Sequence, residues 1–280
     1  MKQREVNLAG VAVVTGAGSG IGRATAHRLA RLGAKVHVVD VDEAAAVAVT
    51  EEIAGAGGRA TAHTVDVSDA AAVETLATNV FEQDGGVDVL HNNAGIGHAG
   101  PVDETALDDW RRIVEINLMG AIHGIHAFVP RMLEQGRPAH VVNTASALGL
   151  MPGVELAPYA TTKFALVGLS QSLNAELAPR GIGVTALCPG VISTAIVERT
   201  TARGGMVERK AKTVDFYRRR GASPDVVADA VVEAIRKRRV IQPVPASHVY
   251  PGWIAGRISP RLGQAMARLT HRLIIGRRDA

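Results

Sequence analysis

A tyrosine and a lysine, Tyr159 and Lys163, lie four residues apart, and a serine, Ser146, lies 13 residues before the tyrosine. Four residues make about one helical turn, so on a helix the phenol and the ammonium project from the same face. A neighbouring positive charge stabilises a phenolate and should lower the pKa of Tyr159 from about 10 toward the range of an acid–base catalyst. The spacing predicts a proton-transferring pair, although a surface tyrosine beside a solvated lysine would give the same spacing.

A glycine-rich turn follows a short apolar run near the N-terminus. Residues 8–14 predict a buried strand, and residues 23–32 have a helical pattern. Between them lies Thr15-Gly16-Ala17-Gly18-Ser19-Gly20-Ile21-Gly22. A strand, a glycine turn and a helix N-terminus in this order form a cradle for phosphate, because glycines allow close approach and the first N–H groups of the helix are unpaired. We therefore expect a nucleotide site at this turn.

Four motifs in order along the chain resemble the short-chain dehydrogenase/reductase family in its shorter, single-domain form. They are Thr15-Gly16-x-x-x-Gly20-x-Gly22, then Asn92-Asn93-Ala94-Gly95, then the set Asn117, Ser146, Tyr159 and Lys163, and last Pro189-Gly190 with Thr194. The match runs from about Leu8 to Val244. The resemblance implies a Rossmann-type α/β fold and an NAD(P)-dependent oxidoreductase.

The resemblance also implies a role for each member of the polar set. Tyr159 would be the general acid in ketone reduction and the general base in alcohol oxidation. Lys163, together with the oxidised nicotinamide, would lower the pKa of Tyr159, and it would also bind the nicotinamide ribose. Ser146 would donate a hydrogen bond to the substrate oxygen. Asn117 would open the backbone bonding of its helix and complete a proton relay, a polar task that suits a poor helix former.

Further residues would hold the cofactor by resemblance. The pyrophosphate would lie on the turn, the adenine edge on the Asp66 side chain and Val67 backbone, and the carboxamide on the Thr194 hydroxyl and backbone near Val191. Asp66 could instead only cap the following helix. The full expected cofactor set is Gly16, Ser19, Gly20, Ile21, Gly22, Asp40, Asp66, Val67, Asn93, Ala94, Gly95, Tyr159, Lys163, Pro189, Gly190, Val191 and Thr194.

Asp40 ends the second expected strand and indicates the cofactor type. A carboxylate at this place can accept both ribose hydroxyls of the adenosine half, and it repels a 2′-phosphate. Neither Val41 nor Ser19 supplies a cation for that phosphate. The sequence therefore favours NAD over NADP. The alternative is that Asp40 only caps the following turn and that Asp42 is the charge that matters.

Composition and periodicity bound the fold. The chain has 280 residues, of which 47% are hydrophobic, and apolar runs alternate with helical patterns, which favours a doubly wound parallel sheet of about seven strands with helices on both faces. We expect strands at 8–15, 35–40, 59–65, 87–91, 139–145, 182–188 and 239–244, and helices at 21–32, 43–55, 69–83, 104–133, 158–179 and 224–237. The single cysteine, Cys188, indicates a reducing compartment, and a cytoplasmic location is expected.

We expect one catalytic domain over residues 1–245, in which 191–222 is the mobile substrate loop by resemblance, and a basic extension over 246–280. Residues 1–198 hold 13 Lys and Arg and 21 Asp and Glu, a net charge of −8, so residues 199–280 carry the remaining 18 and 6, a net of +12. From Pro260 the apolar and basic residues have helical spacing. This helix could cover the substrate cleft, contact a membrane surface, or dock on its own or a neighbouring subunit.

The apolar segments 148–154 and 195–197 suggest a hydrophobic secondary alcohol or ketone as substrate. Two other functions stay open, a 3-oxoacyl-carrier-protein reductase using NADPH, whose acidic partner would suit the basic tail, and a non-catalytic NAD-binding regulator. By resemblance the protein should be a homotetramer or dimer with helices 104–133 and 158–179 at the interface. No nucleic-acid partner is expected. No metal is expected either, because His98, His123 and His126 lack metal-ligand spacing.

Overall fold

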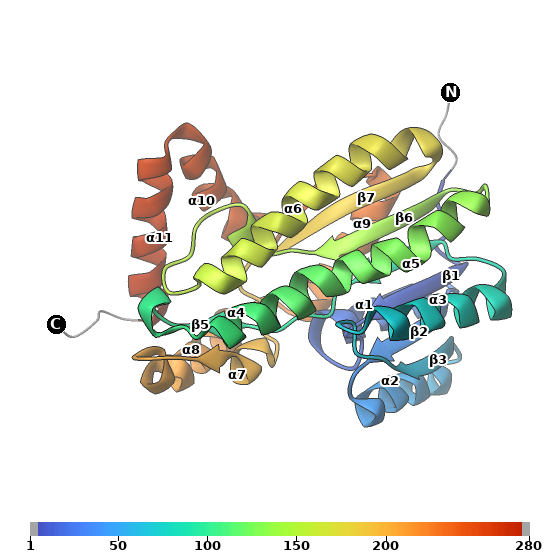
Figure 1. Ribbon diagram of the computed structural model, residues 1–280, viewed down its shortest axis with the longest axis horizontal. Coiled ribbons are helices and arrows are strands. Elements are labelled where there is room, and N and C mark those ends of the chain that lie inside the picture. Colours follow the sequence, from blue (N-terminus) through green and yellow to red (C-terminus); the bar gives the residue numbers. More distant parts are fainter. Residues whose placement is uncertain (1–4, 276–280) are drawn as a thin grey trace.

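Seven parallel strands form the central sheet of the protein, whose computed structural model describes residues 5–275 (Figure 1). The strand order is β3-β2-β1-β4-β6-β7-β9. The order reverses between β1 and β4, which opens a crevice at the carboxyl ends of the strands. The predicted doubly wound sheet of seven strands is confirmed. Its strands are β1 Val11–Thr15, β2 Lys35–Asp40, β3 Arg59–Thr64, β4 Val89–Asn92, β6 Ala139–Thr144, β7 Ile182–Pro189 and β9 Ile241–Val244.

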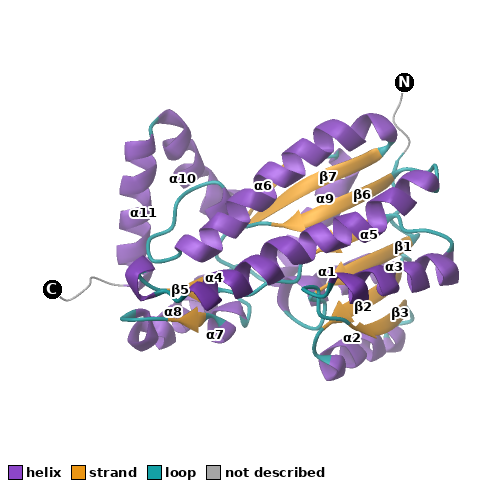
Figure 2. Cartoon of the chain, in the orientation of Figure 1, coloured by secondary structure: helices purple, strands orange, loops and turns teal. Residues whose placement is uncertain are grey.

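Helices cover both faces of the sheet (Figure 2). One face packs against α1 Gly20–Arg31, α2 Glu43–Gly55 and α9 Pro224–Lys237. The other packs against α3 Ala70–Asp84, α5 Gly120–Glu134 and α6 Ala157–Leu177. Every residue of β4, β6 and β7 is buried, because a parallel strand between two helical layers has no wet side. Buried polar residues such as His91, Asn143 and Thr185 interrupt these strands, which are therefore mostly but not continuously apolar.

Side-chain caps fix where two of these helices begin. Asp69 caps α3 by accepting from the backbone N–H groups of Ala71 and Ala72. Ser223 caps α9, and Pro224 is its first residue, as predicted. Asp66 accepts from the backbone and side chain of Ser68 instead. The alternative in which Asp66 only caps the helix is therefore wrong.

The region expected to be one helix over 104–133 has four parts. A 3-10 turn spans Val102–Glu104, α4 spans Leu107–Val114, and a π-helical turn over Glu115–Met119 joins α4 to α5. Within the described residues this is the one helix, Leu107–Glu134, that is long and apolar enough to cross a membrane by length and composition. α5 packs against α3 and β4, as a core helix of the sheet does.

Residues 191–222 are not the loop without regular structure that the sequence suggested. They contain α7 Ile196–Arg199, β8 Thr201–Ala202 and α8 Met206–Arg220. β8 pairs in parallel with β5 His98–Ala99 as a second, small sheet. Both strands have two residues, too few to show periodicity, and α8 is rich in charged residues with few apolar positions to reveal its helical period.

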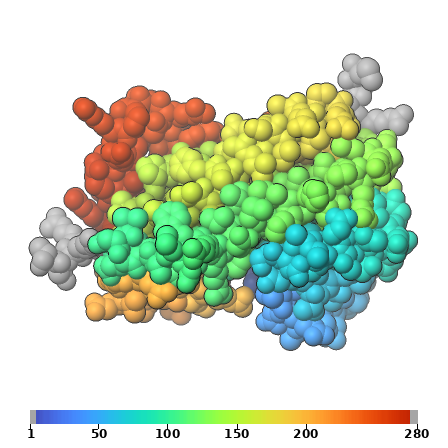
Figure 3. Space-filling view, in the orientation of Figure 1, coloured from blue at the N-terminus to red at the C-terminus, as the bar shows by residue number. Residues whose placement is uncertain are grey.

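The chain after β9 forms two helices, α10 Ala246–Ile258 and α11 Pro260–Ile275. α11 was expected from its spacing, whereas Pro251 and two glycines inside α10 hid that helix in the sequence. The pair docks on its own chain: Gly252 faces Met151, and α11 contacts α8. Three distant segments thus meet at one end of the molecule, where α10 and α11 are red, α8 is orange and α4 is green (Figure 3).

Part of α11 faces away from the protein. Leu262, Leu269 and Leu273 are 49, 50 and 73% exposed, and Arg268 and Arg272 beside them are exposed as well. Of the three expectations for this helix, the structure shows that α11 docks on its own subunit. Membrane contact through the exposed leucines stays a prediction.

Candidate active site

The predicted proton-transfer residues lie at the carboxyl end of the sheet. Ser146 follows β6 by two residues, and Tyr159 and Lys163 lie on the first turns of α6. The Lys163 ammonium lies 5.5 Å from the centre of the Tyr159 ring, so the two side chains share one helical face as expected. A side-chain hydrogen bond links Ser146 to Tyr159. The structure therefore brings together all three residues on which the sequence analysis began.

Lys163 is held in a dry environment. Its side chain is buried, and Nζ donates to the backbone oxygen of Thr144 over 2.9 Å. Burial lowers the pKa of Lys163 to about 8 because the charged ammonium is desolvated. Keeping Lys163 positively charged at neutral pH therefore costs folding free energy that an exposed lysine would not cost.

The pKa of Tyr159 differs from expectation. Burial raises it to about 12, and the hydrogen bond with Ser146 offsets only part of that rise. The expected lowering by Lys163 is wrong for the protein by itself, because the ammonium lies against the ring and bonds to Thr144. Tyr159 is consequently a neutral phenol at neutral pH, the state that can donate a proton.

Asn117 lies in the π-helical turn and is buried. Its Oδ1 accepts from the Ile96 N–H over 2.8 Å, and its Nδ2 donates to the Ile96 carbonyl over 3.0 Å. A Cβ atom added to Gly95 would lie 3.1 Å from Asn117 Oδ1 and 3.5 Å from Lys163 Nζ. Both side chains thus converge on Gly95, where a side chain would fit tightly against the Asn117 amide. The irregular helix that the resemblance implied at Asn117 is present.

The glycine turn forms a close-fitting cradle between β1 and α1. Gly16 and Gly20 have positive φ angles of 61° and 55°, which glycine tolerates best. A Cβ atom on Gly16 would lie 2.8 Å from Ala94 Cα, so the turn rests directly on the segment after β4. The side chain of Ser19 makes no capping bond to α1, so the first N–H groups of α1 point into the crevice. These donors and the missing side chains fit the pyrophosphate of a dinucleotide.

Asp40 is anchored at the edge of this cradle. Its Oδ2 accepts from the Gly18 N–H over 2.8 Å, and its Oδ1 accepts from the Asp42 N–H over 3.1 Å. Asp42 in turn caps α2 through the Ala45 N–H. Asp40 therefore does more than cap the following turn, since the glycine turn itself fixes its carboxylate where an adenosine ribose would lie.

Asn93 ties the cradle to the catalytic side. Its Nδ2 donates to the carbonyls of Thr15 and Gly16 over 3.0 and 3.2 Å, and its Oδ1 accepts from the Thr144 hydroxyl over 3.2 Å. Thr15 Oγ1 accepts from the N–H groups of Asn93 and Ala94. Thr15 and Thr144 were not among the predicted site residues. Their places at strand ends beside the recognised motifs are the sequence signal that could have found them.

The segment after β7 passes above the glycine turn. Gly190 donates to the Val244 carbonyl, and Val191 accepts from the Ala222 N–H. Thr194 lies close enough to Gly20 that a Cβ atom there would be 3.2 Å from Thr194 Cγ2. The Val67 carbonyl lies elsewhere, at the start of α3, where it accepts from His123 Nδ1. The predicted residues after β7 thus border the glycine turn at Thr194, whereas Val67 does not.

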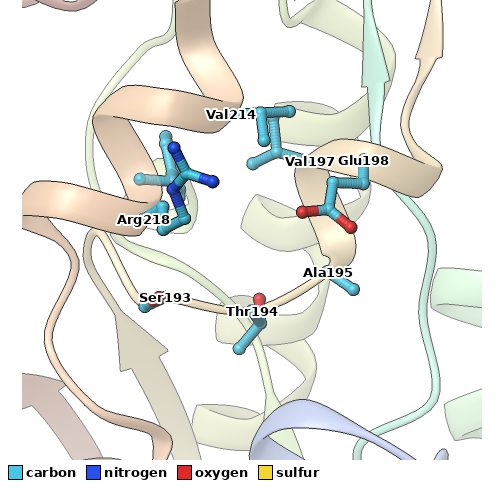
Figure 4. Close-up of a pocket in the computed structure, with 8 residues that line it drawn as sticks. Ser193, Thr194, Ala195, Val197, Glu198, Val214 and Arg218 are labelled. Atoms are coloured by element: carbon cyan, nitrogen blue, oxygen red, sulfur yellow. The ribbon is translucent and has the colours of Figure 1, made fainter. Parts of the chain in front are cut away.

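A cavity of about 230 Å³ opens beside Thr194 (Figure 4). Its walls come from the start of α7 and from the second half of α8, and its lining includes Ser193, Thr194, Val197, Glu198, Val214, Tyr217 and Arg218. Tyr217 also lies near enough to Tyr159 to help raise its pKa. The sequence analysis missed Tyr217, because nothing in the charged pattern of α8 marks one tyrosine as part of a site.

Two other groups were considered from the sequence. Cys188 is buried and unpaired, and burial raises its pKa to about 12, so the thiol is neutral. Over residues 5–275, no three side chains of His, Cys, Asp and Glu are grouped so as to hold a metal ion. His123 instead bonds to the Val67 backbone.

The geometry agrees with comparisons to known proteins. Residues 10–204 match the profile of the family described as short chain dehydrogenase. The chain belongs to this family, the short-chain dehydrogenases/reductases. A family member from Burkholderia phymatum, solved in complex with NAD, has a TM-score of 0.85 at 32% identity, and the match covers 94% of this chain and 96% of that one.

Two curated relatives are similar in sequence. "Probable oxidoreductase EphD" of Mycobacterium tuberculosis is 40% identical over 262 residues, which are 91% of this chain. The match covers 44% of EphD, so the chain spans less than half the length of that relative. "1-deoxy-11-beta-hydroxypentalenate dehydrogenase" of Streptomyces exfoliatus is 43% identical over 196 residues, 69% of this chain and 71% of the relative. Both names denote oxidoreductases, in agreement with the family to which the chain belongs.

Proposed function

We propose that the protein is an NAD-preferring oxidoreductase that interconverts a hydrophobic secondary alcohol and its ketone, with Tyr159 as the general acid and base. One observation carries the proposal. The neutral phenol of Tyr159, bonded to Ser146, lies beside the buried ammonium of Lys163, at the carboxyl edge of the sheet that also carries the glycine cradle. A protein that only bound a dinucleotide would have no use for this proton donor.

When bound, the nicotinamide cofactor supplies the group that gives or accepts the hydride. In ketone reduction, Tyr159 donates its proton to the oxygen on which negative charge develops. Ser146 donates a hydrogen bond to the same oxygen and holds the substrate against the phenol. In alcohol oxidation the same proton returns to Tyr159, so the two directions differ in the protonation state with which Tyr159 begins.

Lys163 favours the step in which Tyr159 loses its proton. Once the oxidised nicotinamide is bound, its positive charge and that of the ammonium would together stabilise the phenolate, an effect that the ammonium, bonded to the Thr144 carbonyl, does not produce by itself. Asn117, fixed by its two bonds to Ile96, completes the route by which the proton is exchanged with solvent. The low pKa of Lys163, about 8, also makes this lysine able to pass a proton on near neutral pH.

Asp40 supports NAD over NADP as the cofactor. Its carboxylate is held by the Gly18 N–H at the place of the adenosine ribose, where it would repel a 2′-phosphate. The Burkholderia phymatum relative was solved with NAD. The name of the Streptomyces relative denotes a dehydrogenase of a hydroxylated compound, which supports an alcohol or ketone substrate. The apolar segments 148–154 and 195–197, of which Ala195 and Val197 line the cavity, support a hydrophobic one.

For the assembly, we propose a cytoplasmic homotetramer or dimer. Its interface would contain the long helix of α4 and α5 together with α6. Phe164 on α6 and Leu107 on α4 are 45 and 70% exposed, which supports a contact there. Sedimentation of the full chain would measure the number of subunits, and a monomer would contradict this part of the proposal.

The test is the change in nicotinamide absorbance with a panel of apolar and polar secondary alcohols and ketones, using NAD(H) and NADP(H) in parallel. We expect turnover with NAD(H) and apolar compounds. Tyr159→Phe should keep NADH affinity within about twofold and lose more than about a hundredfold in kcat, the scale of general acid catalysis. Substantial turnover by this variant would sink the assignment of Tyr159. Turnover with NADPH alone would favour the 3-oxoacyl reductase instead.

A further inference from the structure

Two carboxylates fasten the substrate-side segment 191–222 to the rest of the protein. Asp109 on α4 accepts two bonds from Arg203, of 2.8 and 2.9 Å, and lies 3.6 Å from His98. Glu155, in the loop before α6, lies 3.2 Å from Arg209 on α8 and 3.0 Å from His271 on α11. Each carboxylate therefore lies between an arginine of the segment and a histidine from outside it.

Glu155 is the more deeply placed of the two. Its side chain is 7% exposed, against 12% for Asp109. Its backbone has a φ angle of 57°, an unfavourable conformation for a residue with a side chain. Its carbonyl accepts from the Gly100 N–H over 2.8 Å, just after β5. A glycine would adopt this backbone at lower cost, so the contacts of the Glu155 carboxylate account for a charged residue at this position.

Apolar packing surrounds the same junction. Met206, the first residue of α8, and Ala99 of β5 are buried together. Leu156 from the loop and Ile274 from α11 pack against them. α8, α11 and the loop before the catalytic helix therefore meet in one small core, and the Glu155 ion pairs lie at its edge.

The opposite end of α8 forms the wall of the site. Val214 and Arg218 line the cavity beside Thr194 (Figure 4). Tyr217 lines it as well, and it lies near enough to Tyr159 to help raise its pKa. A helix is stiff along its axis, so the position of Arg209 near its start sets where Tyr217 lies two turns later. The anchor at Glu155 therefore acts on the cavity without touching it.

We propose that Glu155 is a positioning residue for substrate size, which holds α8 over Tyr159, and that His271 makes the C-terminal helix α11 part of this closure. This inference rests on the proposed function, because it assigns to α8 the wall that limits the substrate. Arg209 and His271 reach Glu155 from different helices, so losing either one weakens the junction that this carboxylate makes between α8 and α11. α8 then gains freedom to move away from the loop before α6.

The experiment compares His271→Ala, Glu155→Gln and the double variant with wild type, all as the full chain. His126→Ala is the matched control, since His126 is exposed on α5, far along the chain from the junction. Kinetics are measured with NAD(H) over a series of ketones of increasing size. In parallel, trypsin cleavage after Arg218, Arg219 and Arg220 is timed by mass spectrometry, which reports opening of α8 without any turnover.

We expect both single variants to raise KM for the preferred ketone about tenfold, the factor that follows from one hydrogen bond to a charged group, with kcat within about twofold. The preference for small over large ketones should flatten, and cleavage after the α8 arginines should be about tenfold faster. The double variant should resemble the singles, because all of them break one junction.

Three outcomes would overturn the inference. In the first, trypsin cleaves His271→Ala at the wild-type rate and the variant keeps the wild-type preference for ketone size. The variants could lose thermal stability with unchanged KM for every ketone, or lose kcat alone. If wild type turned over no ketone or alcohol with either cofactor, the proposed function would fail, yet the cleavage rates would still decide whether Glu155 and His271 hold α8.

Discussion

Replacing Lys163, a member of the proposed catalytic set, should stabilise the protein. Lys163 is buried, and its pKa falls from 10.5 to about 8, so the charged form is disfavoured in the folded state. One pKa unit corresponds to about 1.4 kcal/mol, so this change costs about 3 kcal/mol of stability at neutral pH. Lys163→Met keeps the length and apolar stem of the side chain and removes the charge. It also loses the bond to the Thr144 carbonyl, worth about 1 kcal/mol, so we expect a net gain of about 2 kcal/mol.

The pH dependence of the stability difference between Lys163→Met and wild type distinguishes removal of a buried charge from better packing. Between about pH 8 and 10.5, unfolded Lys163 holds its proton while folded Lys163 has lost it. The unfolded state then binds more protons, so wild-type stability rises with pH across this window. The advantage of Lys163→Met should therefore be full below pH 8 and vanish by about pH 10.5.

Urea unfolding of both proteins at several pH values between 7 and 10.5 measures the difference, in which the other titrating groups largely cancel. At pH 7 the variant should also melt about 4 °C higher, at about 2 °C per kcal/mol for a chain of this size. Turnover should be lost. A variant that is less stable than wild type at pH 7, or whose advantage does not change with pH, would refute the reasoning.

Three further predictions concern the cradle, the π-helical turn and α11. Asp40→Ala should lower kcat/KM for NAD at least about tenfold and raise it for NADP, because the fixed carboxylate is gone; an unchanged ratio of the two in steady-state kinetics would contradict this role. Asn117→Ala leaves the Ile96 N–H and carbonyl unpaired and should cost about 2–4 kcal/mol in urea unfolding, whereas a loss below about 1 kcal/mol would show that another group replaces the amide. The full chain should sediment with vesicles containing anionic lipid, and Leu269→Glu with Leu273→Glu should abolish this, unlike the control Val47→Glu on the exposed side of α2. Wild type left in the supernatant would contradict the membrane prediction.

The sheet and its helices were predictable because their signals are local. Asp69 and Ser223 mark helix starts by capping, and β4, β6 and β7 are rich in Val, Leu and Ala because both of their faces are buried. The substrate-side region was not predictable in the same way. β5 and β8 exist only because two distant dipeptides pair, and α10 contains a proline and glycines that argue against a helix. Tertiary contacts decide these elements.

The site also has features that the sequence could predict and features that it could not. Tyr159, Lys163 and the glycine turn were recognisable because their spacing along the chain already places them in space. The pKa of Tyr159 was not, since it depends on burial and on Lys163 bonding to Thr144. The role of Glu155 could not be predicted from the sequence for a further reason. Its partners lie 54 and 116 residues away, and its backbone conformation is set by those contacts.

Asn93 has a consequence for redesign of this enzyme. Three hydrogen bonds form a chain: Asn93 Nδ2 donates to the Gly16 carbonyl, the Thr144 hydroxyl donates to Asn93 Oδ1, and Lys163 Nζ donates to the Thr144 carbonyl. The dinucleotide loop and the catalytic lysine are thus one mechanical unit, and grafting a foreign loop at Gly16 would displace the proton-transfer machinery with it. Asp40 contacts the loop at Gly18, outside this path. Cofactor exchange is therefore best engineered there, where binding and catalysis are separable modules.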